Sequence, residues 1–383
     1  MSKKIVFAMH STNLAGGVRA IFEISNGLVD KGYDVKIVAL GGDHTWFKLR
    51  APVIYLEPSS VVKALINLYR IIKFKKAKST YLDIERFAKR FGFHVDLVSV
   101  LAESLAKLES DVVIATWYPT ALSVWLAKVP KPFFFMQDFP ELVEETMGFI
   151  GLRLFELTLH LPFHFLAVST YTKDLILNYN ENAKISITGA GVNLNVFYPR
   201  KNKAIDSKNK HVVMIILRDM KFKGGDIAIK ALNLVNKKLP IHGIIISNKR
   251  TVDRIFRIVK PDFEYSIFSK PNDELLASLY SSSDVFLFTS YKEGFGLPPL
   301  EAMATGTAVV TTNCGGVNDY AVNDYNALIV PPGDLQTIAE SVLKILNNNK
   351  LKDKLIQGGL ETAKNWTWNK VVNKIEEATR SDN

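Results

Sequence analysis

Residues 291–306, YKEGFGLPPLEAMATG, place two carboxylates, Glu293 and Glu301, on either side of a loop rich in glycine and proline. The preceding run DVFLFTS has the apolar character of a buried strand, and Pro298 and Pro299 suit the first turn of a helix. A loop between a strand and a helix brings free backbone N–H groups and the helix dipole to a ligand, which favours an anion. Carboxylates accept hydrogen bonds from hydroxyls. The pattern therefore indicates a site for a ligand that carries both phosphates and sugar hydroxyls.

A purely structural role is an equal alternative for Glu301, because a glutamate in the first helical turn gains about 0.3 to 1 kcal/mol from the helix dipole. Glu293 lies before the expected helix, next to Gly294 and Gly296, which allow unusual backbone angles and a close approach to a ligand. A carboxylate at that position has no evident role in folding. The two glutamates together are thus a stronger sign of binding than Glu301 alone.

Cationic side chains follow a second apolar run, VVMIILRDMKFKGGD, which places Arg218 at the end of a strand and Lys221 and Lys223 in the next loop. Cleavage of the bond between a sugar and a diphosphate leaves negative charge on the leaving group, and fixed cations in a water-poor site stabilise that charge. Arginine can bind phosphate oxygens with two hydrogen bonds, and lysine acts as a point charge. Without the glutamate pair, such basic residues are more often solvated surface groups.

The elements that position these residues repeat one pattern. Short apolar runs alternate with amphipathic helical segments over the first half of the chain, and the alternation restarts at residue 211. This alternation predicts parallel sheets with helices on both faces. A polar, lysine-rich segment between the two series has the composition of a linker. We predict two doubly wound α/β domains at 1–195 and 211–365, joined by a linker at 196–210.

Composition narrows the class of protein. The net charge of +10 suggests a polyanionic partner, which would be a nucleic acid, an anionic membrane or a phosphorylated substrate. The single cysteine excludes an intrachain disulfide and agrees with a reducing compartment, and the seven histidines lack ligand spacing, so no metal site is predicted. The apolar run at Ile5–Met9 is too short for a signal peptide, and no apolar stretch is long enough to span a membrane. We expect a cytoplasmic protein.

Much of the positive charge lies between Lys63 and Arg90, where nine basic residues alternate with apolar ones and two acidic ones. A basic amphipathic helix at 63–90 would bind the inner face of an anionic membrane, which would make the protein peripheral there. A solvated helix face on a basic protein is the equal alternative.

Residues 280–334, above all SYKEGFGLPPLEAMATGTAVVTTNCGGVNDYAVNDYNALIVPPGD, resemble the donor-binding segment of family 4 glycosyltransferases. These are retaining enzymes of the GT-B fold, in which two Rossmann-like domains face each other across a deep cleft. Their hallmark is two glutamates separated by seven residues, the spacing of Glu293 and Glu301. The resemblance implies that Glu301 holds the nucleotide ribose and that Glu293 lies against the donor sugar. The loop between them would meet the sugar and phosphate through the backbone of Gly294, Phe295, Gly296 and Leu297.

The resemblance also assigns residues to the diphosphate. It implies that Arg218 and Lys223 clamp the diphosphate, although the family usually has glycine where this chain has Leu217, whose side chain would narrow the phosphate pocket or shift Arg218. Gly16 and Gly17, between the first expected strand and helix, would face the donor phosphates across the cleft. Their alternative role is that of ordinary turn residues, and they are not part of a G-x-G-x-x-G dinucleotide motif.

Other segments resemble the family less closely. Where many members carry a histidine near the donor sugar, this chain has Gln137 and Asp138, as in some rhamnosyltransferase-like members. Asp138 either orients acceptor or donor hydroxyls or caps a turn before Pro140. The tail at 366–383 resembles the closing helix that packs back on the first domain, with its tryptophans as packing anchors.

The resemblance thus implies a retaining, metal-independent glycosyltransferase without a cofactor. It would move a sugar from a nucleotide-diphosphate sugar, held mainly by the second domain, to a glycan or lipid-linked acceptor on the first domain. The catalytic set would be Glu293, Arg218, Lys223 and Asp138. The alternatives are a sugar-nucleotide epimerase of the same fold and, with less support, a basic nucleic-acid-binding protein, for which no binding fold or aromatic platform is evident.

Overall fold

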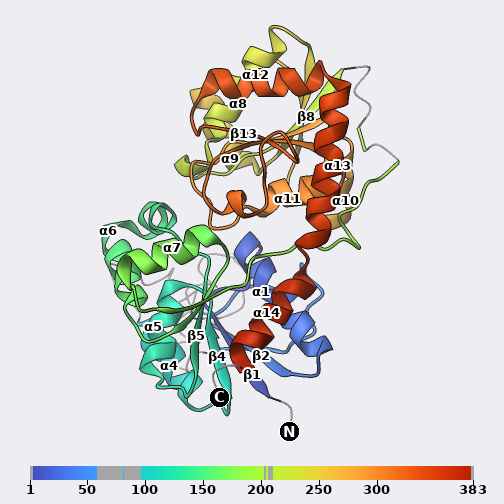
Figure 1. Cartoon of the computed structure of the whole chain (residues 1–383). Helices are drawn as coiled ribbons and strands as arrows, with labels where there is room; N and C mark the ends of the chain where they lie inside the picture. Colours follow the sequence, from blue (N-terminus) through green and yellow to red (C-terminus); the bar gives the residue numbers. More distant parts are fainter. Residues whose placement is uncertain (1–2, 58–80, 82–95, 202–203, 206–209, 381–383) are drawn as a thin grey trace, which may run out of the picture. The chain divides into compact units, whose positions relative to one another are not determined.

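The structure is a computed structural model, and it describes residues 3–57, 81, 96–201, 204–205 and 210–380. The basic residues of the predicted membrane-binding helix at 63–90 lie outside these described residues. Figure 1 shows the chain coloured from its N-terminus to its C-terminus. No helix in the described part combines the length and the apolar character needed to cross a membrane.

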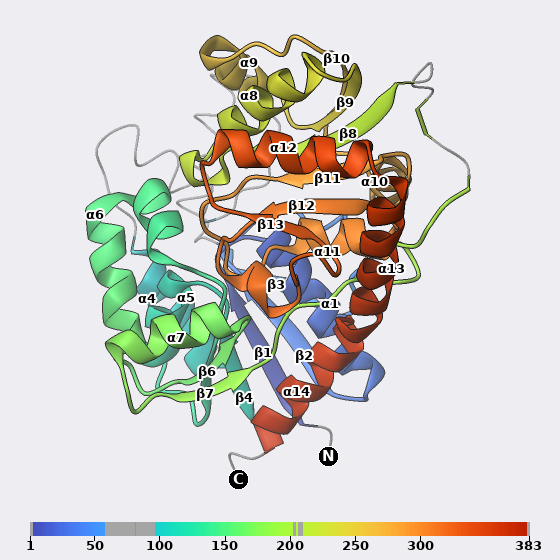
Figure 2. The same ribbon diagram turned by 45° about the horizontal axis from the view of Figure 1, so that its top comes forward.

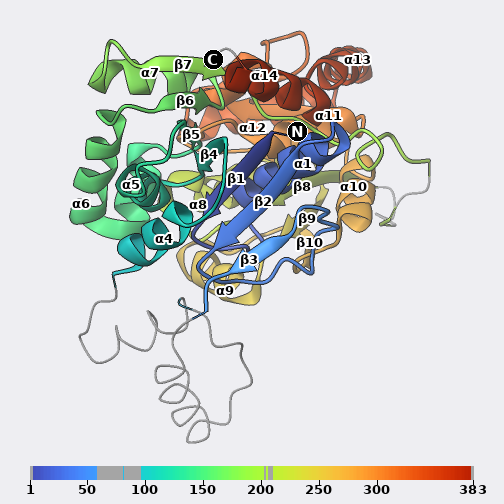
Figure 3. The same ribbon diagram turned by 90° about the horizontal axis from the view of Figure 1, so that it is seen from below.

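The first half of the chain forms a sheet of seven parallel strands in the order β3-β2-β1-β4-β5-β6-β7. Figure 3 shows β1, β2 and β3 side by side in this sheet. The strands are β1 (Lys4–Met9), β2 (Asp34–Ala39), β3 (Val53–Tyr55), β4 (Val112–Ala115), β5 (Pro132–Met136), β6 (His164–Ala167) and β7 (Lys184–Ile187). The helices in the described part of this half are α1 (Gly16–Asp30), α4 (Leu97–Ala106), α5 (Tyr118–Leu126), α6 (Pro140–Leu159) and α7 (Thr170–Tyr179).

The second half forms a sheet of six parallel strands in the order β10-β9-β8-β11-β12-β13. Its strands are β8 (His211–Ile216), β9 (Ile241–Ile246), β10 (Glu264–Phe268), β11 (Val285–Phe288), β12 (Ala308–Thr312) and β13 (Leu328–Val330). Its helices are the 3-10 turns η1 (Lys221–Lys223) and η2 (Gly316–Asp319), with α8 (Gly225–Asn236), α9 (Lys249–Ile258), α10 (Asp273–Ser281), α11 (Leu297–Ala304), α12 (Leu335–Leu346) and α13 (Asn349–Asn365). Figure 2 shows β11, β12 and β13 between α12 and α11.

Both sheets have the strand order of the doubly wound Rossmann fold, in which the order reverses between the first and the fourth strand. The central strands of both sheets read as continuous apolar runs in the sequence because helices cover both faces and bury nearly all of their side chains, whereas the edge strands β3, β7 and β10 are partly exposed. The reversal points lie between β1 and β4 in one sheet and between β8 and β11 in the other. In open α/β sheets, ligands bind at the carboxyl ends of the strands that flank such a point.

The chain divides into two compact units that differ slightly from the expected domains. The N-terminal unit contains residues 1–168, 172–188 and 371–383, and the C-terminal unit contains residues 169–171 and 189–370. The segment at 196–210, expected as a separate linker, therefore belongs to the C-terminal unit.

The last helix, α14 (Trp368–Arg380), returns to the N-terminal unit from Val371 onward. Its Glu376 accepts hydrogen bonds from Lys31 at 2.6 Å and from the Tyr33 hydroxyl at 2.8 Å, and Lys3 donates to the carbonyl of Thr379 at 2.6 Å. Its apolar residues Val371, Val372, Ile375 and Ala378 are buried. The closing helix is thus part of the core of the first unit.

Candidate active site

The loop after β11 is held in one shape by its own backbone. The N–H of Glu293 donates to the carbonyl of Cys314 at 2.7 Å, and the N–H of Gly316 donates to the carbonyl of Glu293 at 3.0 Å. Gly296 has φ of 84°, and an added Cβ there would lie 2.5 Å from a methyl carbon of Val317. Gly296 is thus required both for its left-handed backbone and for close packing, whereas Gly294 has no positive φ.

Helix α11 begins at Leu297, so Pro298 and Pro299 lie in its first turn as predicted. Glu301 is the fifth residue of this helix and not part of the first turn, so the dipole role considered for it is wrong. Its side chain is buried, and the hydroxyl of Tyr280 donates a hydrogen bond to its Oε2 at 3.2 Å. A carboxylate buried within a helix is expensive unless it is hydrogen-bonded, so Glu301 has a specific partner instead of a general electrostatic role.

Glu293 is also buried, and it is a counter-ion for Lys223. The Lys223 ammonium donates to both carboxylate oxygens, at 2.7 and 2.9 Å, and Ser290 Oγ donates to Oε1 at 2.7 Å. The expectation that Glu293 has no role in folding is therefore wrong. The predicted diphosphate ligand Lys223 and the predicted sugar ligand Glu293 form one partly buried ion pair.

Arg218 follows β8, and its guanidinium lies within electrostatic range of both glutamates. Protein packed around the guanidinium lowers the pKa of Arg218, whereas the Glu301 and Glu293 carboxylates act in the opposite direction. An arginine remains charged despite such a shift. The side chain of Leu217 is fully buried in the core of the C-terminal sheet, so the expected narrowing of a phosphate pocket by Leu217 is wrong.

Phe295 contributes to this loop mainly through packing. Its ring lies 5.2 Å from the ring of Tyr320 and 5.4 Å from that of Trp366, and the hydroxyl of Tyr320 donates to the carbonyl of Gly296. Trp366 is therefore a packing anchor, as predicted. The backbone around Leu297, and not the Phe295 ring, is what this loop can offer to a ligand.

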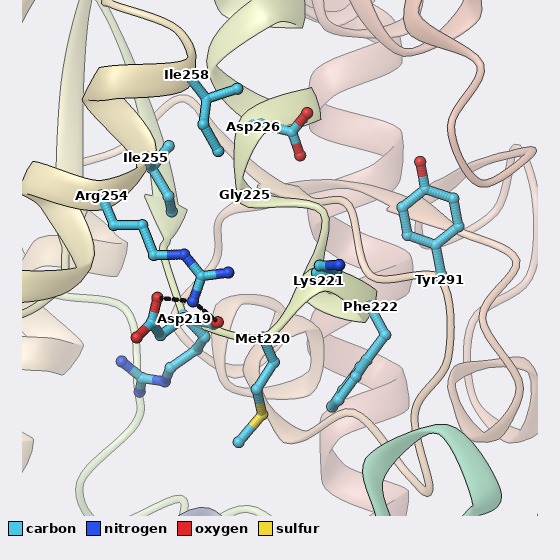
Figure 4. Close-up of a pocket in the computed structure, with 11 residues that line it drawn as sticks. Asp219, Met220, Lys221, Phe222, Gly225, Asp226, Arg254, Ile255, Ile258 and Tyr291 are labelled. Carbon is cyan, nitrogen blue, oxygen red and sulfur yellow. Dashed lines mark hydrogen bonds and ion pairs between the residues drawn. The ribbon is translucent and has the colours of Figure 1, made fainter. Parts of the chain in front are cut away.

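A pocket of about 510 Å³ adjoins these residues in the C-terminal unit (Figure 4). Its walls come from the loop after β8, from the start of α8, from α9 and from Tyr291. Arg254 on α9 donates to Asp219 Oδ1 at 2.6 Å, which closes one side. Arg218 lines this pocket whereas Glu293 and Glu301 do not, so Arg218 both faces the cavity and lies within electrostatic range of the two carboxylates.

In the N-terminal unit, Gly16 and Gly17 form the first turn of α1, after β1. The residue before them has no side chain that caps the helix, so the first N–H groups of α1 have no capping partner from that residue. An added Cβ at Gly17 would lie 3.1 Å from the side-chain oxygen of Gln137, whereas one at Gly16 would meet no described atom within 4 Å. Gly17 thus leaves room for Gln137 beside this turn.

Asp138 follows β5 and is almost fully buried. Its Oδ2 accepts a hydrogen bond from the backbone N–H of Tyr118, at the start of α5, at 3.2 Å. Burial raises the pKa of Asp138 to about 7, and the bond to Tyr118 opposes that shift. Asp138 therefore anchors the start of a neighbouring helix, a role that differs from the predicted cap before Pro140.

The remaining chemistry-bearing residues add little to this picture. Within the described part, no group of three or more His, Cys, Asp or Glu side chains is arranged to hold a metal ion. Sequence reasoning missed Tyr280 and Ser290, the two hydroxyl donors to the glutamates. Ser290 lies three residues before Glu293, and this spacing at a strand end could have identified it. Tyr280 lies in a helix-like segment with no comparable signal.

Comparison with known proteins agrees with this arrangement. Residues 199–362 match the family model of the glycosyl transferases group 1. The chain is 25% identical to an uncharacterized glycosyltransferase of Haemophilus influenzae over 91% of this chain and 92% of that protein. It is 26% identical to CapM of Staphylococcus aureus, a capsular polysaccharide biosynthesis glycosyltransferase, over 52% of this chain and 56% of that one.

A similar solved structure is that of Anabaena Alr3699/HepE in complex with UDP and glucose. It has a TM-score of 0.74 and 16% identity, and the match covers 99% of this chain and all of the other. At that identity the likeness concerns the fold, which is two Rossmann-like parallel-sheet units. The chain therefore has the GT-B fold, and its residues 199–362 are similar to the group 1 glycosyl transferases.

Proposed function

We propose that this protein transfers a sugar from a nucleotide-diphosphate sugar to an acceptor hydroxyl with retention of the anomeric configuration. One observation carries the proposal. Arg218 and Lys223 follow β8, Glu293 and Glu301 follow β11, and these two parallel strands are neighbours at the reversal point of the C-terminal sheet. Two cations and two carboxylates thus meet where this fold binds ligands.

The proposed roles follow from the charges. Arg218 and Lys223 stabilise the negative charge that develops on the leaving diphosphate. Glu301 binds the ribose hydroxyls, and Glu293 orients the donor sugar. Lysine has three N–H donors, so Lys223 can bind a phosphate oxygen while it keeps Glu293 in place.

Retention without a protein nucleophile requires attack from the side of the leaving group. The acceptor hydroxyl then gives its proton to the departing phosphate, and no covalent glycosyl-enzyme forms. In this scheme the cations replace a metal ion at the diphosphate, and the reaction should proceed in the presence of a chelator.

The biological setting is proposed from the relatives. CapM is named for capsular polysaccharide synthesis, and the HepE structure contains UDP and glucose. We infer a role in the synthesis of a glycan, polysaccharide or glycolipid, with the acceptor bound by the N-terminal unit. Gln137 and Asp138 favour a rhamnosyltransferase-like donor. Peripheral attachment to an anionic membrane through residues 63–90 predicts binding to anionic vesicles that added salt abolishes.

Thermal unfolding with a panel of ligands tests the core of the proposal. UDP, GDP or dTDP should stabilise the full chain, by about 2.7 kcal/mol at a hundred times the Kd, and an oligonucleotide should not. Glu301→Ala should abolish most of this stabilisation. Nucleotide affinity that survives Glu301→Ala would remove the ribose role, and stabilisation by the oligonucleotide alone would favour a nucleic-acid-binding protein.

Product analysis by NMR then identifies the reaction. We expect a glycoside with the anomeric configuration of the donor, formed only when an acceptor is present. An epimerised nucleotide sugar formed without an acceptor would favour the epimerase, and an inverted product would contradict the retaining mechanism.

A further inference from the structure

The hydroxyl of Tyr280 connects the end of α10 to Glu301 on α11. Tyr280 is fully buried, and its hydroxyl donates to Glu301 Oε2 at 3.2 Å. Its ring lies 5.2 Å from that of Phe286 and 6.3 Å from that of Phe197, and its backbone carbonyl accepts a hydrogen bond from Thr307 Oγ1 at 2.7 Å. Both the backbone and the ring of Tyr280 are therefore fixed by their surroundings.

The chemistry of the pair favours one direction of hydrogen bonding. Burial raises the pKa of Tyr280 well above its ordinary value, and the negative charge of Glu301 raises it further. The phenol thus stays protonated and donates, while an ionised carboxylate only accepts. Because a carboxylate offers about four lone-pair sites, one bond from Tyr280 fixes its orientation and leaves room for bonds from a ligand.

We propose that Tyr280 is a positioning residue for ribose recognition, whose hydroxyl holds the Glu301 carboxylate in the orientation that binds the ribose hydroxyls of the donor. This inference rests on the proposed function, since it assumes that Glu301 meets the ribose. It extends that function by one residue, which touches the carboxylate and does not touch the substrate. Loss of the hydroxyl should therefore affect the recognition of ribose specifically.

The test compares ribose recognition in the full-length wild type and in Tyr280→Phe, which removes one oxygen and keeps the ring. Isothermal titration calorimetry gives the Kd values of UDP and GDP, which carry an intact ribose, and those of their 3′-deoxy counterparts. A hydrogen bond from the ribose to a charged group strengthens binding, so the Kd of the wild type for the intact ribose ligand should be lower than that for the 3′-deoxy ligand by roughly tenfold or more. In Tyr280→Phe we expect this preference to fall below about threefold, in keeping with the loss of that bond.

Tyr325→Phe is a matched control. Tyr325 also donates to a glutamate, Glu361 Oε2, at 2.7 Å, but at the exposed surface of the same unit. The Tyr325→Phe variant should keep the full preference for the intact ribose. The double variant, Tyr280→Phe with Glu301→Ala, should have the same ratio of the two Kd values as Glu301→Ala alone, because Tyr280 acts through that carboxylate.

The outcomes separate the two proposals. A wild type that binds no nucleoside diphosphate would overturn the proposed function itself. A wild type that binds and prefers ribose, with the preference unchanged in Tyr280→Phe, would overturn only the positioning role. The ratio of the two Kd values is measured on the folded protein, so a lower melting temperature of Tyr280→Phe would not imitate the expected result.

Discussion

The ion pair between Lys223 and Glu293 fixes both side chains before a donor arrives. Glu293 is buried and Lys223 is partly buried. Such a pair contributes little to stability as a whole, but removal of Lys223 leaves the Glu293 carboxylate buried without its counter-ion. The pair also keeps a cation next to the place proposed for the diphosphate. A site that is organised in advance needs little rearrangement when charge develops in the transition state.

We expect Lys223→Gln to lower kcat/KM for the donor by roughly 100-fold or more, the usual cost of losing one group that stabilises developing charge. Lys221→Gln, two residues earlier in the same short helix, is the control and should stay within about threefold of the wild type, since it is not proposed to touch the diphosphate. Donor hydrolysis or transfer assays measure both. Equal losses in the two variants would show that only the general positive potential of this loop matters.

The buried carboxyl of Asp138 makes a pH-dependent prediction. Its pKa is about 7 in the folded protein and near 3.8 when unfolded, so the folded state holds a proton that the unfolded state releases between these values. The stability of the wild type should therefore fall as the pH rises from 4 to 7 because of this group, and then level off.

Asp138→Asn, which keeps an oxygen acceptor for Tyr118, should lack this contribution. In urea unfolding, the free energy of unfolding of the variant should be close to that of the wild type at pH 4. At pH 8 it should be higher by up to about 4 kcal/mol, given about 1.4 kcal/mol per pKa unit. If the stability curves of the two proteins run parallel between pH 4 and pH 8, burial does not raise the pKa of Asp138.

At the scale of elements, the sequence indicated the segment of strand, loop and helix but not which distant side chains contact its two glutamates. The glycine loop and the two prolines predicted where α11 begins, because their backbone requirements are local. Tyr280 is 21 residues from Glu301, and Lys223 is 70 residues from Glu293. Contacts over such separations arise from strand pairing and helix packing, which no local pattern encodes.

Gly296 tests the link between the loop and the helix. Gly296→Ala would force an alanine into a left-handed backbone and place its Cβ 2.5 Å from Val317, so we expect the C-terminal unit to lose about 2 kcal/mol or more of stability. Gly16→Ala at the start of α1 has no positive φ and no close neighbour, and it should be neutral or slightly stabilising. Denaturant midpoints measure both. A Gly296→Ala protein as stable as the wild type would mean that the loop can adopt another shape.

At the scale of the whole molecule, the alternating pattern predicted both sheets, because strands buried on two faces appear as continuous apolar runs. The grouping of residues into units was not encoded in the same local way. The polar segment 196–210 reads as a linker from its composition, yet it is grouped with the C-terminal unit. Composition reports how polar a segment is, whereas its membership of a unit depends on distant contacts.

The final helix supplies a test of that division. Ile375→Ala should destabilise the N-terminal unit by about 2 to 5 kcal/mol, because the fully buried side chain leaves a cavity. Glu377→Ala, on the exposed side of the same helix, should change stability by less than about 0.5 kcal/mol. Calorimetry with and without UDP assigns the transitions, since a nucleotide bound to the C-terminal unit should raise only the melting temperature of that unit. If Ile375→Ala lowers the melting temperature of the UDP-sensitive transition alone, α14 does not belong to the core of the N-terminal unit.

The return of residues 371–383 to the first unit also has a consequence for synthesis. Domains commonly fold in order as they leave the ribosome, N-terminal first. Here the earlier-made unit lacks one of its core helices until residues 371–380 have been translated, whereas nearly all of the later-made unit is one continuous stretch, 189–370. On the ribosome, the C-terminal unit should therefore be able to complete its fold before the N-terminal unit, whose apolar surface stays uncovered until α14 has been made.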